Sequence, residues 1–166
     1  ILTSNTTVDN SSFTLDLTRD IFVNTERIGS GPGNSVTNTG IGFQMLNALA
    51  GGLRNTAIGN STLKSATSAL DNTALGYQSA QNLTTGAGTT ALGSKAGQFH
   101  ADGTTLLTTP LNSVYLGYQA RGFNNSDSNS IVIGANAIGL GANKTVIGTA
   151  STSLSQLFGT LKLPSY

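Results

Sequence analysis

The chain has 166 residues, the size of one ordinary domain, and a net charge of +1 with only 9% charged residues. It contains no run of basic residues, which argues against nucleic acid or an anionic membrane surface as a partner. It also contains no cysteine, which excludes disulfides and thiolate zinc sites, and no stretch approaches the roughly 18 apolar residues of a membrane span. We therefore expect neither a nucleic-acid partner nor membrane insertion.

The N-terminal part of the chain contains alternating runs that are typical of strands. FTLDL at 13–17 and IFV at 21–23 alternate without belonging to any repeat. We predict that residues 1–28 form a β segment that caps the following structure. GSGPG at 29–33 lacks the lysine and the serine or threonine of a phosphate loop, and nothing else in the sequence predicts a cofactor.

A five-residue phrase recurs along most of the chain. It reads NTGIG at 38–42, NTAIG at 55–59 and NTALG at 72–76, and its closing glycines are separated by 17, 17, 17, 24, 17 and 14 residues. A fixed period predicts a solenoid in which each repeat is one coil. We predict an all-β fold with a parallel β-roll over 29–150, built from 17-residue coils and one 14-residue coil. The closing glycines are Gly42, Gly59, Gly76, Gly93, Gly117, Gly134 and Gly148.

The strand that precedes each glycine is apolar on both faces. The residue next to the glycine is always a large aliphatic one, and the residue two positions earlier shares its face. The residue between them is small in the first coils, from Gly40 to Ala91, and points to the opposite face. A strand that is apolar on both sides is usually covered on both sides. We predict that the small face packs against other subunits of a cyclic homo-oligomer. The large residues are Ile41, Ile58, Leu75, Leu92, Leu116, Ile133 and Ile147.

Three further positions recur in each coil. The glycine is expected to adopt a turn or bulge conformation that a side chain would obstruct. Asn38, Asn55 and Asn72 open successive strands and are expected to hydrogen-bond along the stack. An apolar position seven residues after the glycine predicts a return strand, and its members are Leu49, Ala66 and Leu83.

Candidate binding residues lie in two places. The 24-residue step places seven extra residues within 98–110, and insertions in solenoids usually become loops on one face, often the binding face. This predicts a receptor-binding loop that contains Phe99, His100 and Asp102. The second place is an aromatic–amide pair after the repeat glycine, at Tyr77–Gln78 and Tyr118–Gln119. Such a pair can stack on a sugar ring and bond its hydroxyls, or it can pack coil edges and subunit joints.

The repeats resemble those of two families of fibrous proteins. Residues 38–97 resemble the repeats of bacteriophage tail fibres, and NSIVIG at 129–134 with KTVIG at 144–148 resembles the head repeats of YadA-type trimeric autotransporter adhesins. The resemblance covers about residues 36–150 and implies a left-handed parallel β-roll assembled as an intertwined homotrimer. The ending SQLFGTLKLPSY resembles the segment that precedes a self-cleaving chaperone in tail fibres. We expect 151–166 to be a β segment that leads to a shaft or to such a chaperone.

The resemblance implies a non-enzymatic structural and receptor-binding module. It would lie outside the cell, on a virion tail fibre or a cell-surface fibre, with a host-surface glycan or protein as partner. In a trimer, three copies of His100 could hold a metal ion, but no further ligand spacing supports that site, and we predict no metal. Two alternatives stay open. One is the head of a bacterial surface adhesin, and the other is a tailspike hydrolase, which would need paired carboxylates such as Asp71 and Asp102.

Overall fold

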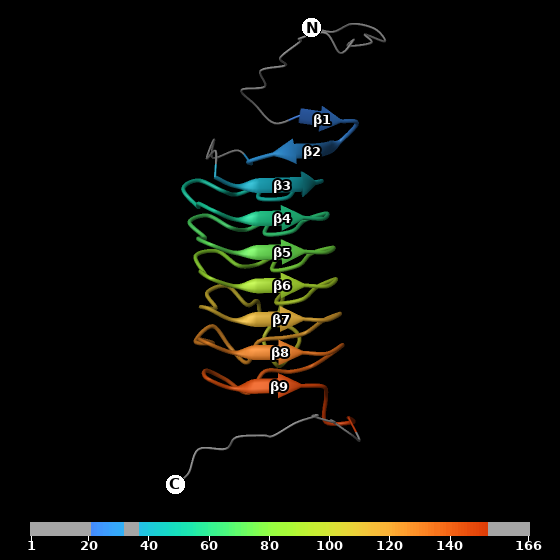
Figure 1. Ribbon diagram of the computed structural model, residues 1–166, viewed down its shortest axis with the longest axis vertical. Helices are drawn as coiled ribbons and strands as arrows, with labels where there is room; N and C mark the ends of the chain where they lie inside the picture. Colours follow the sequence, from blue (N-terminus) through green and yellow to red (C-terminus); the bar gives the residue numbers. More distant parts are fainter. Residues whose placement is uncertain (1–20, 32–36, 153–166) are drawn as a thin grey trace, which may run out of the picture.

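The computed structural model describes residues 21–31 and 37–152. The predicted strand at 13–17 and nearly all of the C-terminal segment 151–166 lie outside these ranges. Within them the chain is all-β and contains no helix. One nine-stranded sheet runs in sequence order from β1 to β9 (Figure 1). The strands are β1 Ile21–Val23, β2 Glu26–Gly29, β3 Thr39–Gly42, β4 Thr56–Ile58, β5 Thr73–Leu75, β6 Thr90–Leu92, β7 Val114–Leu116, β8 Ile131–Ile133 and β9 Thr145–Ile147.

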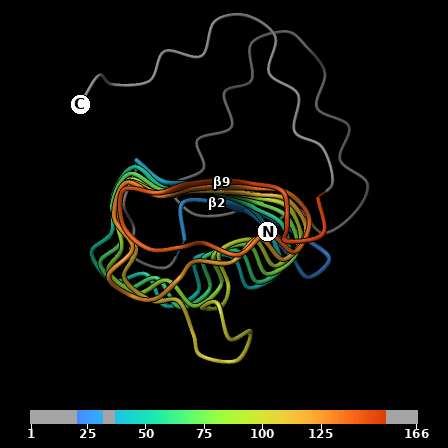
Figure 2. The same ribbon diagram turned by 90° about the horizontal axis from the view of Figure 1, so that it is seen from below.

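The strands from β3 to β9 pair in parallel, one coil apart, so the predicted parallel solenoid is confirmed. Each strand meets the equivalent residues of the next, as in Ile41 opposite Ile58 and Ile58 opposite Leu75. At the first edge β1 and β2 form an antiparallel hairpin, and β2 pairs antiparallel with β3. Viewed along the stack, the coils overlie one another as a flattened ring with the strands along one long side (Figure 2). Isolated parallel bridges, such as Leu53 with Leu70, join the coils outside the strands.

The small residues at the centre of each strand fill the inside of the coil. Ala57, Ala74 and Ala91 are at most 1% exposed within a single chain, and the burial pattern along these strands places the flanking residues outward. The prediction that this face packs against other subunits is therefore wrong. The central residue of each strand points into the coil, and later coils place Tyr115 and Val132 there. The large aliphatic and threonine side chains consequently lie on the outer face of the sheet.

The predicted return strand is also wrong, although its apolar residues were correctly expected to be buried. Leu49, Ala66 and Leu83 are at most 3% exposed, but they follow turns and belong to no strand. The chain turns because alternate residues adopt left-handed backbone conformations, as at Gln44 (φ 55°) and Leu46 (φ 49°). This alternation bends the backbone tightly enough to close the coil in few residues.

The repeat glycines have the role that the sequence predicted. Gly42, Gly59, Gly76, Gly93, Gly117 and Gly134 have φ between 128° and 137°. A Cβ atom at Gly42 would lie 2.5 Å from the carbonyl oxygen of Gly59 in the next coil. The glycine is therefore required twice, once by its backbone conformation and once by the close approach of the next coil.

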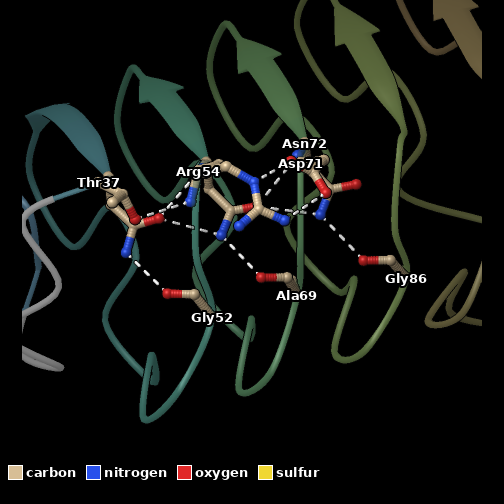
Figure 3. Close-up of polar contacts among 9 residues, drawn as sticks. Thr37, Gly52, Arg54, Ala69, Asp71, Asn72 and Gly86 are labelled. Carbon is tan, nitrogen blue, oxygen red and sulfur yellow. Dashed lines mark hydrogen bonds and ion pairs between the residues drawn. The ribbon is translucent and has the colours of Figure 1, made fainter.

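The asparagine stack is confirmed and lies inside the coil corner (Figure 3). Asn55 is 1% exposed, and its backbone N–H donates to Asn38 Oδ1 at 2.8 Å while its side-chain amide donates to the Ala69 carbonyl at 2.8 Å. Asn72 repeats both contacts, with Asn55 Oδ1 and with the Gly86 carbonyl. Each asparagine thus satisfies backbone groups of the coil corner that would otherwise be buried without partners.

Candidate functional site

A continuous aliphatic face covers the outer side of the sheet. Its central column extends over all nine strands, because Ile21 and Ile28 of the antiparallel hairpin continue the register of the repeat residues. Eight steps of about 4.8 Å give this column a length of about 38 Å. The side chains are substantially exposed, for example 42% at Leu75 and 57% at Ile147. The column contains Ile21, Ile28, Ile41, Ile58, Leu75, Leu92, Leu116, Ile133 and Ile147.

Threonine and aliphatic residues lie beside this column on the same face. Thr39, Thr73 and Thr90 are exposed, and Val114 and Ile131 continue their line. None of the seven strands from β3 to β9 contains a charged residue. Contiguous apolar patches of this kind are uncommon on the surfaces of monomeric proteins.

The extra residues of the 24-residue step form a small hairpin that projects from the roll (Figure 2). Phe99 and Leu106 form an antiparallel bridge, and the backbone N–H of His100 donates to the Thr105 carbonyl at 2.8 Å. The backbone N–H of Gly103 donates to the His100 carbonyl at 2.9 Å and closes the tip. The hairpin is therefore a defined structure and holds Phe99, His100 and Asp102 close together.

Asp102 is committed to the turn of this hairpin. Its carboxylate accepts the backbone N–H groups of Thr104 and Thr105, each at 2.8 Å, and the Thr105 hydroxyl at 2.6 Å. These hydrogen bonds, with the Thr105 hydroxyl contributing most, hold the pKa of Asp102 far below its usual range. The carboxylate shapes the turn and stays ionised, so it is a poor candidate for a general acid.

The hairpin contacts the next coil. The backbone N–H of Ala101 donates to the Phe123 carbonyl at 3.4 Å, and Arg121 Nη1 lies 2.5 Å from the position that a Cβ at Gly103 would occupy. Phe123 is 45% exposed and Leu106 47% exposed. Arg121 and Phe123 therefore join the hairpin in one surface. The sequence alone does not show which coil supports the insertion.

His100 is half-buried, and its Nε2 atom is buried without a hydrogen-bond partner among the described residues. Over 21–31 and 37–152, no group of three histidine, cysteine, aspartate or glutamate side chains could hold a metal ion. In the same ranges no helix is long and apolar enough to cross a membrane.

The aromatic–amide pairs form a second exposed region. Tyr77 and Tyr118 are 49% and 52% exposed, while Gln78 and Gln119 are half-buried. The side chain of Gln98, at the base of the hairpin, donates to Gln78 Oε1 at 3.4 Å. The two candidate regions are thus linked through one buried amide.

A pocket that the sequence did not predict lies beside Phe43, where the first coil meets the antiparallel hairpin. It has a volume of about 270 Å³ and is lined by Thr25, Arg27, Phe43, Gln44 and Asn47. The Arg27 guanidinium donates to the Met45 carbonyl, which fixes the arginine on this side of the roll. The only sequence signal was that Phe43–Gln44 occupies the same coil position as the two Tyr–Gln pairs.

The interior of the roll contains one polar pair that the repeat pattern also did not predict. Tyr115 is fully buried in the column that holds alanine in earlier coils, and its hydroxyl donates to Asp127 Oδ2 at 3.1 Å. Burial, together with the Asp127 carboxylate, raises the pKa of the Tyr115 phenol far above its usual range. Asp127 also accepts the backbone N–H of Phe123 at 2.9 Å. Asp127 therefore connects the buried Tyr115 to the backbone of Phe123, which lies in the coil that contacts the hairpin.

Three of the described carboxylates, those of Asp71, Asp102 and Asp127, have separate partners. Asp71 forms a surface ion pair with Arg54 across one coil step (Figure 3). Asp102 bonds its own turn, and Asp127 lies inside the roll. The hydrogen bonds from Arg54 lower the pKa of Asp71. The contacts assign these acids to different structural tasks.

Comparison with known proteins gives no match: no family model matches the chain, and neither does any curated protein or solved structure.

Proposed function

We propose that the chain is a non-enzymatic structural and receptor-binding module of a trimeric, phage-like tail fibre, which acts outside the cell and attaches to a host-surface glycan or protein. One observation carries this proposal: the uncharged aliphatic column exposed along nine strands. The number of subunits comes from the resemblance of the repeats to trimeric fibres and adhesins.

The outer face of the sheet is the surface through which the subunits associate. Monomeric proteins seldom expose contiguous apolar patches larger than a few hundred Å². Depletion of charge at the centre and enrichment in apolar side chains are typical of homo-oligomer interfaces. Ile41 and Leu75 at 42% exposure, and Leu92 at 39%, would lose this exposure on association. Burial of the column therefore stabilises the fibre and extends its interface over the β1–β2 hairpin.

The projecting hairpin with Arg121 and Phe123 is the first candidate receptor surface. It combines exposed apolar side chains, Leu106 and Phe123, with cationic and imidazole groups at its base. Three copies in one fibre would raise weak individual contacts to a useful avidity. The head of a bacterial adhesin would share this arrangement, and the source of the chain distinguishes the two. A hydrolase has less support, because its two carboxylates must flank one bond, whereas Asp71, Asp102 and Asp127 bond separate partners.

The oligomeric state tests the assembly. Sedimentation equilibrium of the wild-type chain should give three times the chain mass. Leu75→Asp should convert it to a lower-mass or unfolded species, because the charge would be buried at the interface. Leu111→Asp is the matched control, since Leu111 is 45% exposed but lies outside the strands. A well-folded wild-type monomer would overturn the proposal, because the aliphatic column would then be stable in contact with solvent.

Cell binding tests the receptor surface. Replacing residues 100–105 by a short Asn-Gly turn removes the tip but keeps Gln98 and Leu107, which are buried. We expect this variant to remain trimeric and to lose attachment to cells that the wild-type chain binds. Unchanged attachment would remove the hairpin as the site, and release of oligosaccharides from host polysaccharide would overturn the non-enzymatic assignment.

A further inference from the structure

An aromatic residue followed by glutamine occurs in every second coil, at one fixed place. The first residue of each pair comes directly after the repeat glycine, as Tyr77 follows Gly76 and Tyr118 follows Gly117. In the intervening coils the first place holds no aromatic residue and the second holds no glutamine. The pairs are Phe43–Gln44, Tyr77–Gln78 and Tyr118–Gln119, and the intervening residues are Asn60–Ser61, Ser94–Lys95 and Ala135–Asn136.

The register of the sheet places these residues in one column. Ile41, Ile58, Leu75, Leu92 and Leu116 are paired neighbours, so the residues two positions later follow the same line. Phe43 and Tyr77 are therefore two coils apart, as are Tyr77 and Tyr118, which corresponds to about 9.6 Å at each step. Aromatic rings that stabilise one another have centroids about 4.5–7 Å apart. A two-coil step places the rings beyond that range, so stacking on each other does not explain the column.

The rings are available at the surface. Phe43, Tyr77 and Tyr118 are 38%, 49% and 52% exposed. Asn60 and Ser94, which lie between them, are too short to cover the ring faces. The glutamines that follow adopt the left-handed conformation in all three coils, with φ of 55°, 56° and 52°. The glutamine that follows each ring therefore has the same backbone geometry in all three coils.

The first member of the column lines the pocket of about 270 Å³ beside the antiparallel hairpin. There the ring of Phe43 is joined by the amides of Gln44 and Asn47, the hydroxyl of Thr25 and the guanidinium of Arg27. One apolar ring face surrounded by hydrogen-bonding groups is the chemistry that binds a pyranose ring, whose faces carry C–H groups and whose edge carries hydroxyls. Four of the five lining residues carry hydrogen-bonding side chains, which suits a hydroxyl-rich ligand better than a lipid.

We propose that the column is an elongated glycan-binding track that begins at the Phe43 pocket and runs along the roll past Tyr77 to Tyr118. Its ligand is a linear polysaccharide of pyranose rings, lying parallel to the stack so that sugars contact the rings at intervals of about 9.6 Å. This step is close to the repeat of an extended 1,4-linked disaccharide. The proposal rests on the proposed attachment to a host-surface glycan, and it assigns that attachment to the roll itself in addition to the hairpin.

Cell binding by labelled full-length protein, measured against four variants, tests the track. Tyr77→Ala and Tyr118→Ala remove one ring each, while Asn60→Ala and Ser94→Ala alter the same column without removing a ring. Loss of one ring contact should weaken binding by up to about tenfold, since a ring contact contributes about 1.5 kcal/mol at most. The asparagine and serine variants should bind as the wild type does. All four variants should keep the wild-type mass in sedimentation, because the track requires no subunit contact from these rings.

Polysaccharide released from the bound cells and fractionated by length is the competing probe. Inhibition should strengthen in steps of two sugars until the chain spans Phe43 to Tyr118, and periodate oxidation of the cells should abolish binding. Unchanged binding by the Tyr77→Ala/Tyr118→Ala double variant, or its dissociation into monomers, would overturn the track while the proposed function stands. Insensitivity to periodate would do the same, because the receptor would then not be a glycan. A wild-type chain that binds no cells would remove the proposed function together with the track.

Discussion

The regular coils between Gly42 and Gly93 and the irregular coils between Gly93 and Gly148 are held together in different ways. In the first region each coil repeats an interior alanine and, at its corner, a buried Asn or Thr whose backbone N–H bonds the asparagine of the preceding coil. In the second region the coil lengths change, the interior column holds Tyr115 and Val132, and serines replace the asparagines at the corner. The outer aliphatic column continues through both regions without change.

Comparison of the regular and irregular coils shows where a solenoid tolerates variation. In the regular region one pattern satisfies every coil, because the same backbone groups recur with the same partners. In the irregular region each departure needs its own compensation. The left-handed Gly97 leaves room for the Tyr115 ring, since a Cβ there would lie 2.9 Å from that ring, and Asp127 then satisfies the Tyr115 hydroxyl. Substitutions in the two regions should therefore fail for different reasons.

The largest loss of stability is expected from Tyr115→Ala, which empties the interior of the irregular region. Removing a buried aromatic ring costs about 3–5 kcal/mol. Tyr115→Phe is the matched control, because it keeps the ring and removes only the hydroxyl that bonds Asp127, at about 1 kcal/mol. Urea unfolding measures both, and equal losses would show that the polar pair, and not the ring, supports this coil.

Gly76→Ala should cost nearly as much in the regular region, about 3 kcal/mol, through backbone strain and collision with the next coil. The added Cβ would lie 2.7 Å from the Gly93 carbonyl oxygen at a φ of 128°. Gly51→Ala is the control, since nothing lies within 4 Å of its Cβ position and its φ is ordinary. Similar unfolding midpoints for the two alanine variants would contradict the stacking role of the glycine column.

Asn55→Ala should cost about 2 kcal/mol or more, because it leaves the Asn72 backbone N–H and the Ala69 carbonyl buried without this partner. Asn60→Ala removes an exposed asparagine from the same coil and should have little effect. Amide hydrogen exchange at Asn72 adds a local measurement, and we expect faster exchange there in Asn55→Ala. Unchanged exchange would show that the ladder does not protect the corner.

The smallest effect is expected from Asp71→Asn, which removes the surface pair with Arg54, whose side chains are 55% and 49% exposed. Arg54 lowers the pKa of Asp71 in the folded state. The stabilisation is therefore present above the unfolded-state pKa of about 4 and is lost as the pH falls through the lower folded-state value. Unfolding of wild type and variant at about pH 7 and about pH 2 should show a small difference only at the higher pH. A difference that grows on acidification would contradict this linkage.

Much of the fold could be predicted from the sequence, because its determinants are local and recur. The spacing of Gly42, Gly59 and Gly76 predicted the parallel coils. The asparagine at each corner predicted the hydrogen-bonded asparagine stack. The sequence did not show which side of each strand faces inward, because both sides are uncharged. The structure answers that question: the alanine of each regular strand points inward, beside leucines from the turns such as Leu63 and Leu83, and the large aliphatic residue of the strand points outward. The predicted return strand was wrong for a related reason. Residues such as Gln44 and Leu46 adopt the left-handed conformation there, and residue type alone does not indicate this.

The candidate binding regions depend on contacts between coils, which one sequence does not display. The insertion at 98–110 was visible in the sequence as a longer step between repeat glycines. Its contacts with Arg121 and Phe123 could be predicted only if the register of the following coil were known. The pocket at Phe43 forms only because the antiparallel hairpin lies beside the first coil, and the sequence does not show that arrangement. Tyr115 and Asp127 lie 12 residues apart in sequence and belong to adjacent coils, so no local pattern connects them.

The glycine column makes the height of a coil independent of its circumference. Each glycine lets the next coil approach through its backbone alone, and this contact is kept between Gly93 and Gly117 although 24 residues separate them. Residues can therefore be added to or removed from one coil without displacing the strands above and below it. Sequence variation confined to the tip between Phe99 and Leu106 would change the surface that the roll presents while its axial dimensions stay constant.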